Sequence, residues 1–326
     1  MARKQRNRAA DYAVYLVVRL LVAAVQTMPP RWAYAVADAL AWLLYTLVKS
    51  RRRIALENVR AAFPELVNDP VKADRLVRAM FGHFAQSVVE LMLIPRKLHV
   101  GTWRKHLALP EGNLTLPHLL TGRAALIVTA HFGNWEIAGF HLGLCGFRTH
   151  AIARALDNPH LQRFALHFRQ RTGQTIIDKN DDFEFLTEVL KGGGKVATLA
   201  DQDAGPRGVF VDFFGRPAST HKAVALMAMQ FDAVMVVIGV PRVPRTAYPQ
   251  RPDFDPTDPL APLFYAVRVA DVIDPREYAS DPNAVKHMTQ RYSAALEALI
   301  REYPEQYFWL HRRWKHQPKA KGAKAA

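Results

Sequence analysis

The sequence predicts an α/β fold in which helices flank a mostly parallel central sheet, preceded by membrane-associated helices at the amino terminus. The sheet follows from short apolar runs that alternate with helical segments of about ten residues beyond residue 124, a pattern typical of parallel strands joined by helices. The amino-terminal helices follow from two apolar stretches before residue 49. With 326 residues, of which 50% are hydrophobic, the chain can bury a substantial core.

The first apolar stretch, Tyr12 to Met28, ends at the Pro29-Pro30 pair and spans roughly 26 Å as a helix, the low end of what crosses a bilayer. The second, Trp32 to Val48, is interrupted by Asp38. No small-residue cleavage site precedes the two prolines, so we do not expect a cleavable signal peptide. Three interpretations stay open: a membrane helix followed by an interfacial one, a membrane hairpin, or two buried helices of a soluble bundle.

Periodicity and composition place the remaining elements. Helices are predicted over residues 54–63, 71–93, 158–172, 182–190, 220–229 and 281–303. Strands are predicted over residues 125–130, 149–154, 175–177, 195–200, 234–240 and 263–269. A loop-rich segment, residues 98–117, leads into the first of these strands.

The stretch from residue 124 to residue 140 predicts a strand, a tight turn and a helix. His131 stands at the carboxyl end of the strand, Gly133 permits the turn, and Asn134 is a good N-cap for the helix that follows. Glu136 lies five residues after the histidine, so we expect its carboxylate to fold back, hold one imidazole nitrogen as a donor and leave the other free as a base. The alternative is structural, because a first-turn Glu also complements the helix dipole.

Charge is concentrated at three points of the chain, whose net charge is +15. Arg3–Arg8 and Lys49–Arg53 each carry four positive charges and Arg312–Lys324 carries six, which leaves the central body nearly neutral. This arrangement suggests an anionic membrane surface or an acidic protein partner, while a solvated tail explains the last ten residues equally well. The single cysteine, Cys145, excludes an internal disulfide framework and a Cys-rich zinc site, and its apolar neighbours predict a core position.

Two further groups of charged residues follow predicted strands. Arg154 precedes Asp-Asn-Pro, and Arg169 and Arg171 lie on the next helix. Arginines at the carboxyl edge of a sheet bind phosphate bidentately, although a solvated helix face also explains the last two. Asp201 and Asp203 end another strand. No third ligand has metal-site spacing, so we predict no metal and expect the two carboxylates to orient arginines or backbone.

Five ordered blocks resemble bacterial lipid A biosynthesis (lauroyl/myristoyl-type) acyltransferases and their lysophospholipid acyltransferase relatives. They are His131 to Glu136, which has the His-x4-Asp/Glu pattern, and residues 154–159, 200–203, 211–220 and 307–315. The resemblance implies a glycerolipid-acyltransferase-like fold. It divides the chain into a basic amino terminus with membrane-associated helices (1–53), an acyltransferase domain (54–315) and a basic disordered tail (316–326).

The resemblance implies acyl transfer from a thioester, acyl-carrier protein (ACP) or acyl-coenzyme A (CoA), to a lipid hydroxyl, with no cofactor beyond this co-substrate. His131 would take the proton of the hydroxyl, Glu136 would stabilise the imidazolium, and backbone N–H groups near the turn would stabilise the oxyanion. The residues implied for substrate binding are Arg154, Arg169, Arg171, Asp201, Asp203, Phe214, Gly215 and Thr220. The aromatic block around Phe214 is expected to wall an acyl channel, and Thr220 to cap the next helix.

The implied partners are acyl-carrier protein or acyl-CoA, an anionic lipid acceptor and the membrane, with no nucleic acid. The implied location is the bacterial inner (cytoplasmic) membrane, with the active site at its cytoplasmic face and residues 307–315 at the interface. The acceptor stays open between a lipid A precursor-like phosphoglycolipid and a lysophospholipid, because residues 132–135 are closer to the lysophospholipid branch.

Other functions fit the sequence less well. The Gly-x-Ser-x-Gly pattern of serine hydrolases is absent, and residues 191–195 lack the spacing of a P-loop. The remaining alternative is a non-catalytic basic membrane-surface or nucleic-acid binding protein, which leaves the block from His131 to Glu136 unexplained.

Overall fold

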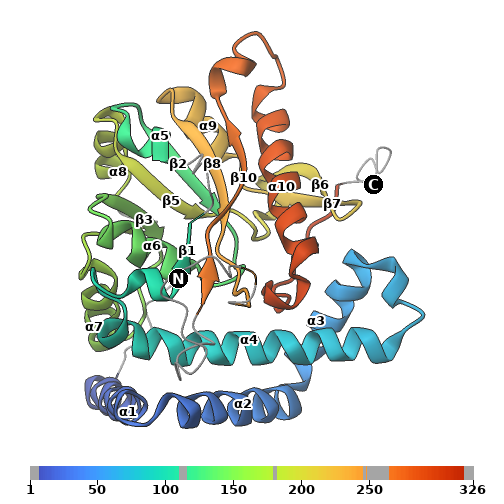
Figure 1. Ribbon diagram of the computed structural model, residues 1–326. Helices are drawn as coiled ribbons and strands as arrows, with labels where there is room; N and C mark the ends of the chain where they lie inside the picture. The colour runs from blue at the N-terminus through green and yellow to red at the C-terminus, as the bar shows by residue number, and fades with distance from the viewer. Residues whose placement is uncertain (1–6, 110–115, 179–181, 245–246, 248–263, 319–326) are drawn as a thin grey trace.

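The computed structural model describes residues 7–109, 116–178, 182–244, 247 and 264–318. A six-stranded sheet in the order β10-β8-β2-β5-β3-β4 forms its centre (Figure 1). Five strands run parallel, and β10 pairs antiparallel with β8. The strands are β2 (Ala125–Thr129), β3 (Thr149–Ala153), β4 (Thr175–Asp178), β5 (Lys195–Leu199), β8 (Val234–Gly239) and β10 (Arg268–Ile273). The predicted α/β class with a mostly parallel sheet is therefore confirmed.

Helices cover the sheet as the alternating pattern predicts. Helices α6, α7 and α8 pack against β3, β4 and β5, while α9 packs against β2 and α10 against β8 and β10. Their bounds are α5 (Leu116–Leu120), α6 (Trp135–Leu144), α7 (Pro159–Gln170), α8 (Phe183–Lys191), α9 (Ala223–Gln230) and α10 (Ala284–Glu302). Every residue of β2 and β8 is buried, which explains why these central strands are continuous apolar runs without alternation.

A helical layer lies beyond the carboxyl ends of the parallel strands, which point toward α4 in Figure 1. Helix α4 (Pro70–Lys97) forms this layer, α1 (Arg8–Thr27) and α2 (Pro30–Leu47) lie on its far side, and α3 (Lys49–Ala62) follows. Helix α2 packs along α4 through Ala33, Ala37 and Ala41, whose small side chains allow the two backbones to approach closely. Because α3 begins at Lys49, the domain boundary predicted after residue 53 falls inside a helix.

The outer faces of α1 and α2 are apolar and uncovered. Leu20, Leu47 and Trp42 are 71%, 67% and 64% exposed, respectively. In the described residues, α1 and α4 are long and apolar enough to cross a bilayer, but 56% of the α4 window is buried in the protein against 17% for α1. Helices α1 and α2 each pack on α4.

Three local predictions differ from the structure. Residues 209–220 form a hairpin of β6 (Val209–Phe213) and β7 (Arg216–Thr220), so Thr220 ends a strand, and α9 begins only at Ala223. The predicted strand at 263–269 is two strands, β9 (Tyr265–Ala266) paired with β1 (Leu107–Ala108), and β10; residue 263 lies outside the described residues. Cys145 is exposed rather than in the core.

The carboxyl-terminal segment 307–315 is buried in part, although its Arg312 and Lys315 are exposed. Tyr307 and Trp309 are 1% exposed, and the buried Arg313 donates to the Ser219 carbonyl at 2.7 Å. His316 binds Asp203 and so belongs to the folded body, not to a disordered tail. Residues 319–326 lie outside the described residues.

Candidate active site

His131 and Asp201 meet at the carboxyl edge of the sheet. Strands β2 and β5 are parallel neighbours in which Thr129 pairs with Leu199, so the residues two positions further along each strand come together. The backbone N–H of His131 donates to Asp201 Oδ2 at 3.1 Å, and its Nδ1 lies 2.8 Å from Asp201 Oδ1. Because an ionised carboxylate only accepts, Nδ1 carries the proton and Nε2 is left as the basic nitrogen.

The electrostatics of Asp201 favour this arrangement. Its side chain has no exposed surface, and burial alone would raise its pKa, but the charge of His131 and the hydrogen bonds from it, followed by the charge of His311, bring the pKa down to about 2. The ring of His311 lies 4.8 Å from that of His131, and its Nε2 is 3.8 Å from Asp201 Oδ2. Burial, above all, lowers the pKa of His311 to about 4. One buried carboxylate therefore faces two imidazoles.

The expected contact between Glu136 and His131 is wrong. Glu136 is in the first turn of α6, where it faces α7 and accepts hydrogen bonds from Arg169: Nε donates to Oε2 at 3.0 Å and a terminal nitrogen donates to Oε1. The pair is partly buried, with 14% of the Glu136 side chain and 29% of the Arg169 side chain exposed. The carboxylate that binds the His131 imidazole is therefore that of Asp201, which follows β5, and the Glu136 carboxylate binds Arg169 instead.

Backbone contacts fix the turn after His131. Gly133 has a φ of 60° and lies so close to the Val240 carbonyl that a Cβ would collide with it, so only glycine fits. The Gly133 N–H donates to the Gln306 carbonyl and the Asn134 N–H to the Val240 carbonyl, both at 2.9 Å. These N–H groups and that of His131 are therefore already used, and they are not the oxyanion donors expected from the turn.

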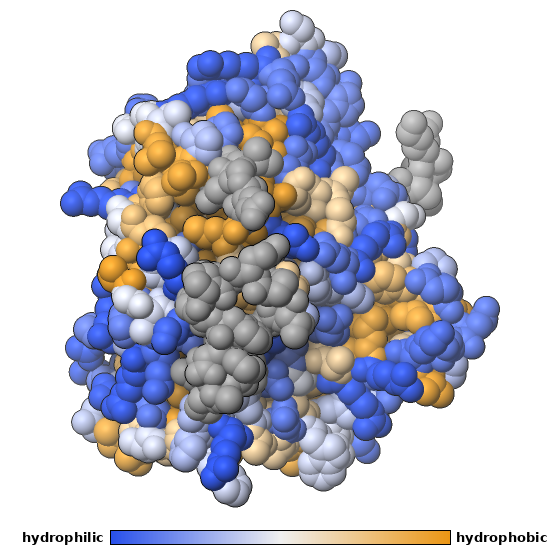
Figure 2. Space-filling view, in the orientation of Figure 1, coloured by the Kyte–Doolittle hydropathy of each residue, from blue (hydrophilic) through white to orange (hydrophobic). Residues whose placement is uncertain are grey.

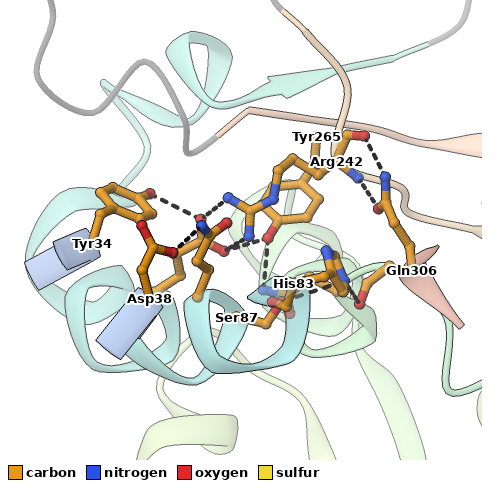
Figure 3. A network of polar contacts seen from close by, with 11 residues as sticks. Tyr34, Asp38, His83, Ser87, Arg242, Tyr265 and Gln306 are labelled. Carbon is orange, nitrogen blue, oxygen red and sulfur yellow. Dashed lines mark hydrogen bonds and ion pairs between the residues drawn. The ribbon is translucent and has the colours of Figure 1, made fainter. Parts of the chain in front are cut away.

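Buried side chains of α4 hold the same turn, as Figure 3 shows. His83 Nε2 is 3.1 Å from the Gly133 carbonyl, and burial lowers the pKa of His83 to about 3, so the neutral ring donates this hydrogen bond. About two turns further along α4, the fully buried Glu90 forms a bidentate ion pair with Arg242, with distances of 2.6 Å and 3.0 Å. Gln306 completes the chain of contacts, because it exchanges hydrogen bonds of 2.7 Å and 2.8 Å with the Arg242 backbone.

This buried network also reaches the amino-terminal helices. Tyr34 of α2 donates to Glu90 Oε1 at 2.9 Å, and Tyr265 of β9 donates to the other oxygen. Helix α2 is thereby connected to the turn that carries His131 through side chains that are buried except for Arg242, which is 16% exposed (Figure 3). This network could not be predicted, because its members lie far apart along the chain.

Two hollows lie on either side of His131. A small apolar cavity of about 90 Å³ lies between α6 and the sheet, with Trp135, Glu136 and Arg169 among its lining residues and aliphatic side chains of β2, β3 and β5 behind them. An open hollow of about 490 Å³ is lined by Gln202 and His311 together with residues of α3 and of the carboxyl-terminal segment. Gln202 Nε2 is 3.5 Å from His131 Nε2, so the basic nitrogen faces this open side.

The other sequence-predicted site residues lie in varied surroundings. Arg154 is 74% exposed and pairs with Asp157, and Arg171 is exposed where α7 ends. Asp203 Oδ2 accepts from His316 Nδ1 at 2.6 Å, which fixes the carboxyl-terminal segment rather than an arginine.

The block at residues 214–220 is structural. Phe214 is 4% exposed and packs against Phe63 and Trp309, so it belongs to the core and does not wall a channel. Gly215, with a φ of 70°, completes the β6–β7 turn. Thr220 accepts a hydrogen bond from Arg313 at 2.7 Å and caps no helix.

Figure 2 shows the face of the molecule that is seen in Figure 1, where hydrophobic patches lie between larger hydrophilic areas. Sequence reasoning missed His311 and His83 as members of the site. His311 stands among aromatic residues that proved to be buried, and a histidine in such a block was the available signal.

Comparison with known proteins gives a consistent set of relatives. The family model described as bacterial lipid A biosynthesis acyltransferase matches residues 1–316. The phosphatidylinositol mannoside acyltransferase of Mycolicibacterium smegmatis is 26% identical over 55% of this chain, and the match spans only 60% of that relative's length. The lipid A biosynthesis palmitoleoyltransferase of Escherichia coli is 24% identical over 83% of this chain and 81% of its own.

One further relative and one solved structure are also similar to this chain. The lipid A biosynthesis lauroyltransferase of Escherichia coli is 24% identical over 94% of this chain and 92% of its own. A solved structure, the 1-acyl-sn-glycerophosphate acyltransferase of Thermotoga maritima, aligns over 82% of this chain and 98% of its own with 12% identity and a TM-score of 0.36.

Proposed function

This chain belongs to the family of bacterial lipid A biosynthesis acyltransferases, and we propose that it moves a fatty acyl group from an acyl thioester, acyl-ACP or acyl-CoA, to a hydroxyl of a lipid. The acceptor is a phosphoglycolipid of the lipid A precursor type or a lysophospholipid. The relatives named for lipid A and for phosphatidylinositol mannosides are both acyltransferases, which supports an O-acyltransferase over a non-catalytic binder.

The observation that carries the mechanism is the pair of His131 and Asp201, with Nδ1 held at 2.8 Å and Nε2 facing the open hollow. His131 Nε2 takes the proton of the acceptor hydroxyl as its oxygen attacks the thioester carbonyl carbon, and Asp201 stabilises the imidazolium. When the tetrahedral intermediate collapses, the C–S bond breaks and the imidazolium returns the proton to the thiolate. General-base action of this kind contributes about 10²–10⁴-fold.

The first turn of α6 supports stabilisation of the oxyanion. Its N-cap, Asn134, accepts from the Ile137 N–H, while the N–H groups of Trp135 and Glu136 have no acceptor among the described residues. Free N–H groups at a helix amino terminus, together with the positive end of the helix dipole, stabilise a developing negative charge. The first turn of α6, rather than the turn at residues 131–134, would therefore donate hydrogen bonds to the oxyanion.

Three potential metal ligands also meet here, because atoms of His131, Asp201 and His311 lie within 4.8 Å of one another. The hydrogen bond between the first two uses the atoms that would bind a metal, which favours proton transfer over coordination. Glu136 and Arg169, which are bound to each other, both line the apolar cavity.

Membrane attachment follows from the outer faces of α1 and α2. These faces carry exposed Leu, Val and Trp side chains on two consecutive helices, and a contiguous apolar surface of this kind marks a membrane or protein contact. The sheet edge that bears His131 faces α4, and α1 and α2 lie on the far side of that helix (Figure 1). We propose that the enzyme acts at the bacterial inner membrane with its site at the cytoplasmic face.

Mass spectrometry of lipids tests the proposed function. A strain that lacks this gene is compared with the same strain carrying the wild-type gene or the His131→Ala variant. The wild type should restore one lipid whose mass is greater by one acyl group, and His131→Ala should not, although it accumulates in the membrane to the same level. Identical lipid profiles in all three strains would exclude this activity.

A further inference from the structure

The open hollow beside His131 carries two arginines that the sequence did not single out. Arg51 of α3 and Arg312 of the carboxyl-terminal segment line it together with Gln202 and His311, and both arginines are exposed. They come from elements far apart in the sequence, which the fold brings to one rim. A bound anionic group at this rim would therefore meet two guanidinium groups from two directions.

Two of the three arginines expected to bind phosphate are paired with carboxylates, Arg169 with Glu136 and Arg154 with Asp157. The third, Arg171, is exposed where α7 ends and does not line this hollow.

Arg51 and Arg312 differ from these arginines. Within the part of the chain that the structure describes, neither side chain has a hydrogen-bond or ion-pair partner. A guanidinium group near a catalytic base and without a carboxylate partner retains its full charge for a substrate.

Positive charge continues from this hollow along α3. A second hollow of about 490 Å³ shares Arg312 and adds Arg216 and Lys315, and a third, of about 660 Å³, adds residues of α3 such as Lys49 and Arg52. The carboxylates among their lining residues are those of Asp203 and Glu57, and Asp203 is bound to His316. The positive electrostatic potential of these three hollows therefore attracts anions to the surface beside His131.

The hollow lies close to the basic nitrogen that takes part in the reaction. Gln202 Nε2, which lines the hollow, is 3.5 Å from the basic nitrogen of His131, and the His311 ring is 4.8 Å from the imidazole. Both substrates of the proposed reaction carry phosphate: the lipid acceptor in its headgroup and the donor in its phosphopantetheine or coenzyme A arm.

We propose that Arg51 and Arg312 form a phosphate subsite that positions a phosphorylated substrate against His131. This inference rests on the proposed acyl transfer and specifies how it selects substrates. A guanidinium–phosphate hydrogen bond contributes about 1.5–3 kcal/mol, so loss of either arginine should weaken substrate binding about 10- to 150-fold. Because these contacts are made equally in the ground and transition states, KM should rise while kcat stays nearly constant.

The test compares Arg51→Gln, Arg312→Gln and the double variant with the wild type, with the donor and the acceptor varied separately. Arg148→Gln is the matched control, since Arg148 is exposed at the opposite, amino-terminal end of β3. A rise in KM for the acceptor alone assigns the phosphate to the acceptor headgroup, and a rise for the donor alone assigns it to the donor arm. Unchanged KM values for both substrates in the double variant would overturn the proposal.

A binding measurement separates this inference from the proposed function. Inorganic pyrophosphate is titrated into each protein and the heat of binding is measured. The wild type and Arg148→Gln should bind it with equal affinity, and the double variant at least tenfold more weakly, by the same estimate of about 1.5 kcal/mol per contact. If the wild type transfers no acyl group yet binds pyrophosphate through these arginines, the proposed function fails and the subsite stands. Equal binding by wild type and double variant would refute the subsite.

Discussion

Replacement of Asp201 by Asn perturbs the contact on which the mechanism depends. The carboxylate accepts from the His131 backbone at 3.1 Å and from Nδ1 at 2.8 Å, and its side chain has no exposed surface. The amide of Asn has nearly the same shape but presents a donor as well as an acceptor. Where the amide N–H of Asn faces the His131 ring, Nδ1 must become an acceptor and the ring proton moves to Nε2. That nitrogen can then no longer take the proton of the acceptor hydroxyl.

The structure sets the size of the effect. Loss of one hydrogen bond to a buried charged group removes about 1.5–3 kcal/mol, or about 10- to 150-fold in rate, and reversal of the tautomer in Ser-His-Asp triads costs about 10⁴-fold. We therefore expect Asp201→Asn to lower kcat by about 10²–10⁴-fold with little change in KM. Acyl transfer is followed by mass spectrometry of the product, and urea unfolding confirms that the variant is folded. A folded variant with kcat within about threefold of wild type would refute the role of Asp201.

Four further predictions follow from other contacts. Glu136→Gln and Arg169→Gln should not be additive: a double-mutant cycle on kcat/KM should give a coupling of about 1.5–3 kcal/mol, and a value near zero would show that their hydrogen bonds are irrelevant. The free energy of unfolding should fall as pH falls below about 6.5, because His83 takes up a proton in the unfolded chain but, with a pKa of about 3, not in the folded one. His83→Gln should reduce this loss of stability between pH 6.5 and 5.5 by about 1 kcal/mol. An unchanged pH dependence in the variant would count against a neutral His83 ring. High salt should fail to extract the protein from membranes, whereas the double variant Leu20→Gln and Leu47→Gln should be extractable, because the free energy of apolar burial scales with area at about 25 cal/mol per Å². Extraction of the wild type by salt would refute attachment through apolar side chains. Chelation with EDTA should leave kcat unchanged, and a loss that zinc restores would mean that a metal occupies the three-ligand cluster.

The parallel strands could be predicted because their physical signature is local. A strand buried on both faces must be apolar throughout, and β2 and β8 are, so their positions and the edge at which His131 lies followed from the sequence. The strand ends also indicated that Asp201 would lie at this edge. Phe214 was misplaced, since an aromatic pair after a strand fits a ligand channel and a packed hairpin turn equally well.

The partner of His131 could not be predicted by spacing. Glu136 is five residues away along the chain, but the imidazole binds Asp201, 70 residues later, because β5 is the sheet neighbour of β2. Strand order is a tertiary property that no local pattern encodes. His83 and Arg51 were missed for the same reason, since each comes from a helix whose docking places it at the site. The basic and aromatic composition of residues 307–315 predicted a surface, but tertiary packing buried Tyr307 and Trp309, while Arg312 stays exposed.

The central claim is that His131 serves as the base for transfer of an acyl group from a thioester to a lipid hydroxyl. The most direct measurement is kcat of the purified protein with an acyl thioester and a phosphorylated lipid acceptor, compared with that of folded His131→Ala. We expect steady formation of acylated lipid by the wild type and a loss of at least about 10²-fold in the variant. Equal turnover by the two proteins would contradict it.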